Sequence, residues 1–229
     1  PCPHRFGLSP RTTPATMKRT LLFALTLSLF VLPTQAQTPN AWINEVHYDN
    51  DGADTGEFLE IVIENPGSYA LSDFKVVRYN GADQLEDETE TVDNLTEGGT
   101  QGNYTLYTWS PSSLQNGSPD GVALCYQGSP VSSGGVAQFL SYEGTFTAAD
   151  ECASGQTSVD IGESEGGSTA IGESLQLTGT GSEYTSFSWN PPAPDSPGSV
   201  NAGQTFTSAT GPVTNTDTNE SFPTIQAAI

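Results

Sequence analysis

Between residues 41 and 206 the chain consists of short apolar or alternating runs, and Gly, Asn, Asp, Pro or Ser interrupts them about every ten residues. No stretch in this region combines a helical period of apolar residues with capping residues at its ends. Short strands separated by Gly- and Pro-rich turns are typical of an all-β sandwich or barrel. A region of about 170 residues is also long enough to bury one sizeable core.

The pattern predicts strands at eight places. They are Ala41–Val46, Glu57–Glu64, Phe74–Tyr79, Asn103–Thr108, Gly121–Tyr126, Val136–Ser141, Glu173–Leu177 and Phe187–Trp189. Consecutive apolar residues in Glu57–Glu64 predict a strand that is buried on both faces. Two long loops are expected, one at residues 82–102, which carry a dense acidic run, and one at residues 144–172.

The start of the chain has the composition of a secretory signal. The basic residues Lys18 and Arg19 precede the uncharged stretch Leu21–Leu32, and small residues follow it. A membrane-spanning helix needs about 20 apolar residues, and this stretch is shorter. We therefore expect residues 17–36 to be a cleaved signal peptide, with a retained anchor as the alternative. Residues 1–16 are then interpreted as an upstream extension that is not native to the protein.

Removal of the signal leaves a strongly acidic chain. Only two basic residues remain, Lys75 and Arg78, against all 27 acidic residues, which gives a net charge of −25. Nucleic-acid affinity depends largely on Lys and Arg, so direct nucleic-acid binding by this segment is not expected. The same charge attracts cations and favours solubility. Cation binding and adaptation to a salty or exposed medium both remain open.

Two cysteines, Cys125 and Cys152, remain after the signal is removed. Paired cysteines are usual in secreted chains, so we expect a disulfide that stabilises the fold by roughly 3 kcal/mol, with two free thiols as the alternative. A catalytic cysteine is disfavoured because His47 is the only histidine left to act as its partner. A lone histidine beside a strand is more typical of structural hydrogen bonding than of general base catalysis.

The sequence offers no complete catalytic motif. Residues 162–166 (GESEG) have the G-x-S-x-G spacing, but no helical pattern of apolar residues follows them, so they lack the strand-turn-helix context of a nucleophile elbow. The chain also has no Gly-rich phosphate loop with a lysine. One histidine and two separated cysteines are too few for a closed zinc site. We therefore expect no enzymatic activity in this segment and no firmly assigned cofactor.

An acidic stretch at residues 47–60 is the one candidate metal site. Asp49, Asp51, Asp54 and Glu57 supply four carboxylates of the kind that calcium prefers, and two glycines allow a tight loop. The spacing does not match an EF-hand loop. Glu57 and Glu60 would point to opposite faces of a strand, so one cage cannot use all the acids. The alternative is a turn whose carboxylates accept backbone N–H bonds.

Several motifs, taken in order, resemble the lamin-tail domain in its bacterial secreted form. They are residues 43–50 (INEVHYDN), 56–61 (GEFLEI), 71–76 (LSDFKV), 79–81 (YNG), 114–124 (LQNGSPDGVAL), 138–146 (QFLSYEGTF), 174–177 (SLQL), Trp189 and 196–201 (SPGSVN). The GEFLEI segment looks like the family's G-E-[FW]-[VI]-E-[IL] strand, and SPGSVN looks like its closing [TS]-P-G-x-x-N. Asp73 departs from the family, which prefers glycine there.

The resemblance implies an immunoglobulin-like β-sandwich over residues 37–206 and no catalytic activity. Domains of this family in bacteria look like accessory modules of secreted proteins, some beside nuclease or phosphatase domains and others beside repeats or adhesive regions. The implied location is extracellular or at the cell surface.

The end of the chain changes in composition. Residues 207–220 are polar and contain Gly-Pro, which indicates a linker. Residues 221–229 (SFPTIQAAI) resemble the opening of secreted right-handed parallel β-helices, in which a short amphipathic helix caps the first coil. We expect a truncated β-helix to begin here.

The sequence as a whole predicts a secreted, non-catalytic module for binding, adhesion or scaffolding within a larger extracellular protein, with calcium as a possible stabilising ion. Its expected partner is an extracellular protein or a polysaccharide, which exposed strand edges could dock. The alternative is an accessory segment of a secreted enzyme, a polysaccharide lyase or a nuclease, whose catalytic domain follows residue 229. Sequence beyond that residue would distinguish the two.

Overall fold

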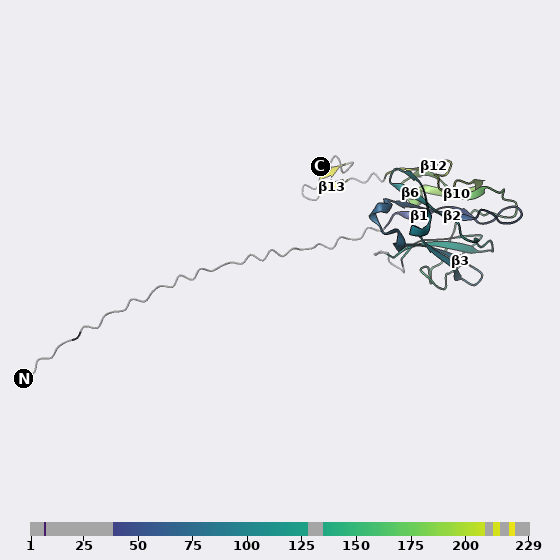
Figure 1. Ribbon diagram of the computed structural model, residues 1–229, viewed down its shortest axis with the longest axis horizontal. Coiled ribbons are helices and arrows are strands. Elements are labelled where there is room, and N and C mark those ends of the chain that lie inside the picture. Colours follow the sequence, from purple (N-terminus) through teal and green to yellow (C-terminus); the bar gives the residue numbers. More distant parts are fainter. Residues whose placement is uncertain (1–6, 8–38, 128–134, 209–212, 216–219, 223–229) are drawn as a thin grey trace, which may run out of the picture. The chain divides into compact units, whose positions relative to one another are not determined.

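Figure 1 shows a computed structural model that describes Gly7 and residues 39–127, 135–208, 213–215 and 220–222. The predicted signal peptide and, apart from Gly7, the predicted upstream extension lie outside these residues. All strands belong to the unit Ala36–Ile229. Within the described residues, no helix has the length and apolar character needed to cross a membrane.

The described fold is all-β. Its strands are β1 (Ala41–His47), β2 (Phe58–Glu64), β3 (Phe74–Asn80), β4 (Leu85–Thr91), β5 (Thr96–Gln101), β6 (Tyr104–Trp109), β7 (Asp120–Tyr126), β8 (Val136–Tyr142), β9 (Val159–Asp160), β10 (Glu173–Gly181), β11 (Phe187–Pro194), β12 (Gln204–Phe206), β13 (Val213–Asn215) and β14 (Glu220–Phe222). The 3₁₀ turns are η1 (Pro66–Ser68), η2 (Leu71–Asp73), η3 (Val92–Asn94) and η4 (Tyr184–Ser186).

The strands form two main sheets that pack as a β-sandwich. The first, sheet A, has the order β11-β10-β1-β2-β6-β5, and β12 pairs in parallel with β10. The second, sheet B, has the order β4-β3-β7-β8-β9. In Figure 1, β3 lies in a different layer from β1, β2, β6 and β10. This arrangement confirms the predicted all-β sandwich.

All eight predicted strands are present, and β2 is buried on both faces as expected. The predicted loop at residues 82–102 is wrong, because this segment contains β4 and β5. Both are strands at the ends of their sheets, where the backbone hydrogen bonds of one neighbour are enough to hold a polar sequence. The predicted linker at residues 207–220 also contains β13, which pairs with β14. Residues 223–229, most of the expected β-helix opening, lie outside the described part.

The central core fills the space between the two sheets. Its buried members are Ile43, Val46, Tyr48, Leu59, Ile61, Ile63, Phe74, Val76, Val92, Tyr107, Trp109, Leu114, Val122, Leu124, Tyr126, Leu140, Tyr142 and Leu175. Alternate residues of the same strands point to the opposite faces, so each sheet also has an outer apolar face. Each of these outer faces is covered by a different segment of the chain.

Residues 182–206, named here the C-terminal cover, include β11 and β12 at the end of sheet A. Phe187 and Phe206 of this segment pack on Trp42 and Tyr104, on the outer face of β1 and β6. The end of β10 leaves β1 and pairs with β12 instead. The ring of Trp42 then lies 5.7 Å from Tyr104, 5.6 Å from Phe187 and 5.9 Å from Phe206, measured between ring centroids. Such aromatic contacts add to the stabilisation from area burial.

Residues 144–158, named here the loop cover, pack on the outer face of sheet B. Phe146 lies 5.3 Å from Phe139 of β8, and Ala148 and Ala153 are buried in the same cluster. A disulfide joins Cys125 of β7 to Cys152 of the cover, with the two Cα atoms 6.4 Å apart. The covalent bond therefore ties this cover to a central strand of sheet B.

Candidate functional site

The four predicted calcium ligands follow β1 and do not share a common partner. The Asn116 amide donates to Asp54 at 3.0 Å, and Glu57 accepts the Leu114 N–H. The side chain of Asp51 is exposed, and that of Asp49 is half-buried. Burial raises the pKa of Asp49, and the neighbouring carboxylate of Asp54 raises it further.

Among the described residues, no group of three or more His, Cys, Asp and Glu side chains is placed to hold a metal ion. Glu57 lies just before β2 and reaches the loop at Leu114, whereas Glu60 lies within β2 and reaches Gly198. The two glutamates therefore diverge, as their spacing predicts. The calcium site itself stays a prediction, which a calcium titration of the melting temperature against a magnesium control would test.

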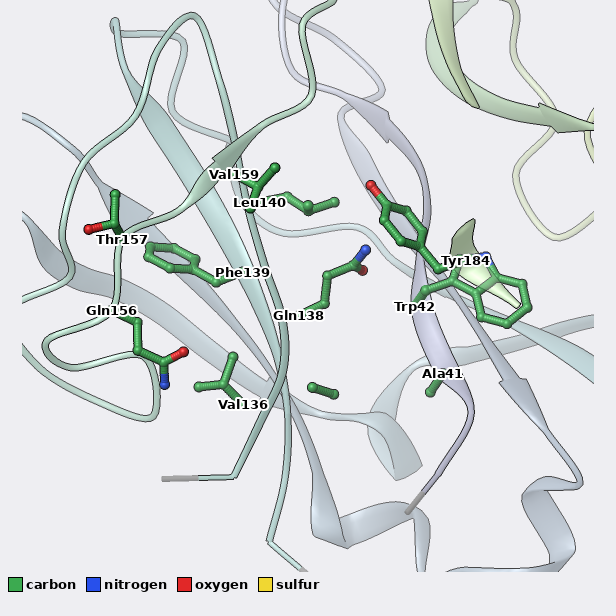
Figure 2. Close-up of a pocket in the computed structure, with 11 residues that line it drawn as sticks. Ala41, Trp42, Val136, Gln138, Phe139, Leu140, Gln156, Thr157, Val159 and Tyr184 are labelled. Carbon is green, nitrogen blue, oxygen red and sulfur yellow. The ribbon is translucent and has the colours of Figure 1, made fainter. Parts of the chain in front are cut away.

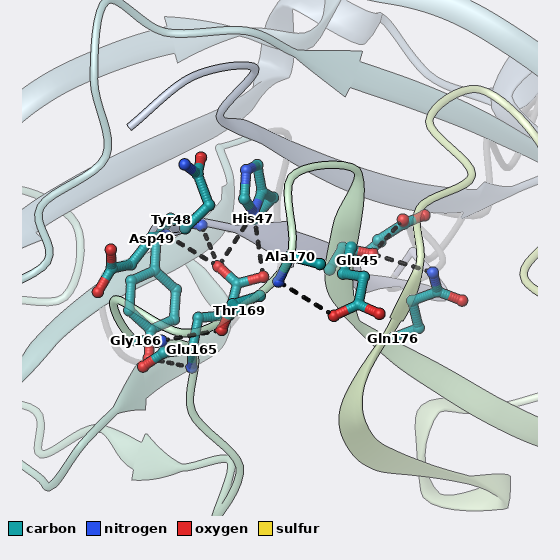
Figure 3. Close-up of polar contacts among 12 residues, drawn as sticks. Glu45, His47, Tyr48, Asp49, Glu165, Gly166, Thr169, Ala170 and Gln176 are labelled. Atoms are coloured by element: carbon teal, nitrogen blue, oxygen red, sulfur yellow. Dashed lines mark hydrogen bonds and ion pairs between the residues drawn. The ribbon is translucent and has the colours of Figure 1, made fainter. Parts of the chain in front are cut away.

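His47, at the end of β1, is buried and lies against Glu165 (Figure 3). Its Nδ1 is 3.0 Å from Glu165 Oε1, and its Nε2 is 3.2 Å from the Thr55 carbonyl oxygen. Burial alone would lower the pKa of His47, but the hydrogen bond and the charge of Glu165 outweigh it and raise the pKa. Both ring nitrogens are thus engaged by the protein.

The same glutamate holds the backbone of the acidic stretch. The N–H groups of Tyr48 and Asp49 donate to Glu165 Oε2 at 2.5 Å and 2.9 Å, and the Glu165 N–H donates to the Tyr48 hydroxyl at 2.7 Å. Sequence reasoning missed Glu165, because it lies 118 residues from His47, and the Gly-, Ser- and Glu-rich loop around it (residues 162–166, GESEG) gives no indication of a histidine partner. The observed bonds make this carboxylate a structural acceptor of N–H groups.

A second carboxylate group lies on the outer face of sheet A. Glu45 of β1 and Glu60 of β2 are paired across the strands, and both are fully buried. Glu60 accepts from the Asn44 amide at 3.0 Å and from the Gly198 N–H at 2.7 Å. Burial raises the pKa of Glu60 to about 8, and the nearby Glu45 contributes to that rise. Near neutral pH the neutral form of Glu60 is therefore favoured.

Glu45 completes the contact with the C-terminal cover. It accepts from the Ser174 hydroxyl at 2.6 Å and from the Ser196 N–H at 2.9 Å. Gly198 has a φ of +78°, which favours glycine, and its carbonyl accepts the Gly99 N–H of β5 at 2.7 Å. Glu45 and Glu60 thus anchor the segment that contains Ser196 and Gly198 to sheet A.

A groove opens between the edges of the two sheets (Figure 2). Its volume is about 350 Å³. It is lined by Ala41, Trp42, Val136, Ala137, Gln138, Phe139, Leu140, Gln156, Thr157, Val159 and Tyr184. Tyr184 is the one titratable residue in this lining, so the groove offers no carboxylate, imidazole, amine or thiol.

Two buried hydrogen-bond donors in this lining have no partner in the described structure. They are Trp42 Nε1 and Gln138 Nε2. The other amide atom of Gln138, Oε1, accepts the Ile43 N–H at 2.7 Å and so links β8 to β1. An unpaired buried donor is costly unless an acceptor from water or a ligand reaches it. No sequence pattern indicated this groove, because its walls come from four separate segments.

We compared the chain with models of known protein families, with curated proteins and with solved structures, and none of them matched.

Proposed function

We propose that this protein is a secreted, non-catalytic binding module with an immunoglobulin-like fold of the lamin-tail type. The observation that carries the proposal is the chemistry of the groove between β1 and β8. A groove that offers strand edges and apolar side chains but no carboxylate, imidazole, amine or thiol is suited to binding a ligand. Its lining includes the hydroxyl groups of Thr157 and Tyr184 but no base of these kinds to activate them.

The buried acids support the same proposal. Glu45, Glu60 and Glu165 each accept backbone N–H groups, so in the described structure they act as structural acceptors. A catalytic carboxylate would instead need access to a substrate in a cleft. None of the three lines the groove between β1 and β8. Glu165 lies at a second hollow of about 490 Å³, but it is buried and its carboxylate is taken up by backbone N–H groups and His47.

The type of sandwich rests on the motifs quoted above. Residues 43–50 and 56–61, which resemble the opening of a lamin-tail domain, supply Glu45 and Glu60. Residues 196–201, which resemble its closing motif, supply the Ser196 and Gly198 N–H groups that these carboxylates accept. Three separate motifs of one family that meet in one buried contact support the assignment. Secretion rests on the signal sequence at residues 17–36.

The binding function is tested by interferometry with the purified, immobilised protein. The analytes are a set of basic, neutral and acidic polypeptides and a set of neutral and acidic polysaccharides. We expect saturable binding to at least one analyte, weakened by salt because the protein is strongly acidic, and no change in the mass of any analyte after incubation. Absence of saturable binding throughout, or turnover of an analyte that copurifies with the protein, would reject the proposal.

A further inference from the structure

The outer edge of β8 is largely without a strand partner in the described structure. On one side, β8 pairs with β7 from Val136 to Tyr142. On the other side, the two-residue strand β9 pairs only with Leu140 and Ser141. The residues of β8 that precede Leu140 therefore present an open edge in the plane of sheet B. Open edges of this kind are templates for an added strand.

The groove is built around this edge. Figure 2 shows Phe139 projecting from β8 toward Gln156 and Thr157, whereas Gln138 projects to the opposite side, toward Trp42 and Tyr184. An extended chain placed along β8 would have alternate side chains pointing to these two sides. One side is lined by Gln156 and Thr157, and the other by Trp42 and Tyr184.

The end of the groove nearest β9 carries Val159, whose side chain is 62% exposed. Val159 pairs with Leu140, so β9 occupies the edge of β8 at Leu140 and Ser141, and the edge before Leu140 is open. A bound strand would occupy the same edge just before β9. An exposed valine at this position provides apolar contact for the end of such a strand.

The unpaired donors indicate the chemistry of the occupant. Trp42 Nε1 and Gln138 Nε2 are buried at the wall of the groove and need acceptors. A polypeptide in extended conformation presents a carbonyl oxygen at every residue, and it can satisfy side-chain donors and strand edges together.

The burial of the aromatic rings argues against a polysaccharide in this groove. Trp42 is 1% exposed and Phe139 is 6% exposed, so neither ring face forms an open platform on which a sugar could stack. The net charge of −25 after removal of the signal further favours a partner with positive charge. These observations together select an extended polypeptide with basic residues at its ends.

We infer that the groove binds an extended, basic-flanked segment of a partner protein as an additional strand beside β8. This inference rests on the proposed binding function and names the class of partner and the mode of binding. The bound segment continues sheet B beyond β8, in line with β9, and its side chains fill the two sides of the groove.

The first test uses a synthetic peptide with the sequence Lys-Lys-Val-Thr-Val-Thr-Val-Lys-Lys, labelled with fluorescein. Its binding to the purified protein is measured by fluorescence anisotropy. The control peptide has the same side chains, with methyl groups on the backbone nitrogens of all three valines and both threonines, because the N–H groups of successive residues face opposite edges of a strand. Loss of these donors removes strand pairing without changing side chains or charge, so we expect affinity to fall about ten-fold or more. Equal affinity of the two peptides would overturn the inference.

The second test locates the site with two matched variants. Val159→Lys places a long charged side chain at the groove, and Ile171→Lys makes the same change at another exposed apolar residue, 68% exposed and outside the groove. We expect Val159→Lys to weaken peptide binding about ten-fold relative to Ile171→Lys, which has the same net charge. In ¹⁵N-labelled protein the peptide should shift the amides of Val136–Phe139 most.

The outcomes separate this inference from the proposed function. Peptide binding that is equal in the two lysine variants, or that shifts amides elsewhere, leaves a binding module but overturns the groove as its site. No peptide binding, together with polypeptide or polysaccharide binding in the wider set of analytes, also overturns the inference alone. Self-association of the unliganded protein through the β8 amides would assign the edge to a second copy and contradict it.

Discussion

The C-terminal cover and the loop cover perform the same task on opposite sides of the sandwich, but they are held by different chemistry. The C-terminal cover packs on Trp42 and is anchored by Glu45 and Glu60, which accept backbone N–H groups. The loop cover packs on Phe139 and is joined to β7 by the disulfide of Cys125. One cover therefore depends on buried titratable groups and the other on a covalent bond.

The difference follows from what each cover brings to its sheet. The C-terminal cover supplies Phe187 and Phe206 to a cluster that already contains Trp42 and Tyr104. The loop cover supplies only Phe146 and two buried alanines, Ala148 and Ala153. A smaller apolar contact stabilises less, so a cross-link contributes more to holding that segment in place. We expect the first cover to respond to pH and the second to reducing agents.

The largest effect is expected from Trp42→Ala, which removes the ring that three aromatic residues contact. The free energy of unfolding should fall by about 4 kcal/mol, as is usual when a buried tryptophan is truncated. Phe146→Ala is the counterpart in the loop cover and should cost less, because the disulfide still holds that segment. Urea unfolding measures both variants. A larger loss for Phe146→Ala would contradict the comparison.

The next effect concerns the disulfide. Replacing Cys125 and Cys152 together by alanine should lower the free energy of unfolding by about 3 kcal/mol, the value expected for a loop of this length. Without the cross-link the loop cover should in addition open by itself, so hydrogen exchange should accelerate most at Ala148 and Gly155, which are bonded within the loop cover. Exchange at Gly198, bonded to Glu60, should accelerate less. Equal acceleration of hydrogen exchange in both covers would show that the two covers open together and not independently.

Strands of both sheet A and sheet B could be predicted from the sequence, because β2 and β7 are apolar runs bounded by turn residues. It failed for β4, whose residues Leu85–Thr91 are mostly polar and form a strand only because β3 supplies the pairing. The roles of Glu45 and Glu60 were also not predicted. From sequence alone, a carboxylate within a strand is normally interpreted as exposed. The N–H groups that donate to Glu45 and Glu60 lie up to 151 residues away in the sequence. Such contacts depend on the folded topology, which a local pattern does not encode.

A pH dependence should distinguish the C-terminal cover from the loop cover. The pKa of Glu60 is raised from 4.5 to about 8 in the folded state, so between these values the native state binds a proton that the unfolded state has lost. The stabilising contribution is therefore complete below pH 4.5 and is lost as pH rises to 8. Each pH unit corresponds to about 1.4 kcal/mol at most, and we expect about 2 kcal/mol in total after the site relaxes around the charge.

Glu60→Gln removes this titration, so its free energy of unfolding relative to the wild type should rise between pH 4.5 and pH 8. Glu97→Gln makes the same change at an exposed position in β5 and serves as the charge control. Chemical unfolding at several pH values measures both. Parallel pH curves for the wild type and Glu60→Gln would reject the assignment of the pH response to this carboxylate.

The smallest effect should come from Glu165→Gln, in the segment that connects the two covers. Glutamine keeps one carbonyl oxygen for the Tyr48 and Asp49 N–H groups, and its amide can donate to Nδ1 of neutral His47. We therefore expect a loss of only about 1 kcal/mol at neutral pH.

Glu165→Gln should also change the pKa of His47 in the folded state. In the wild type the folded-state pKa of His47 is raised by Glu165, so the contribution of the pair is complete below pH 6.5 and is lost as pH rises through the folded-state pKa. Without the negative charge of Glu165, burial lowers that pKa, and only the contacts with the Thr55 carbonyl and Asn50 still raise it. The His47 ring resonances, followed by NMR during a pH titration, should then move at lower pH in Glu165→Gln than in the wild type. An unchanged midpoint would show that Glu165 does not hold the proton on His47, and the segment between the covers would then be anchored only by its backbone bonds.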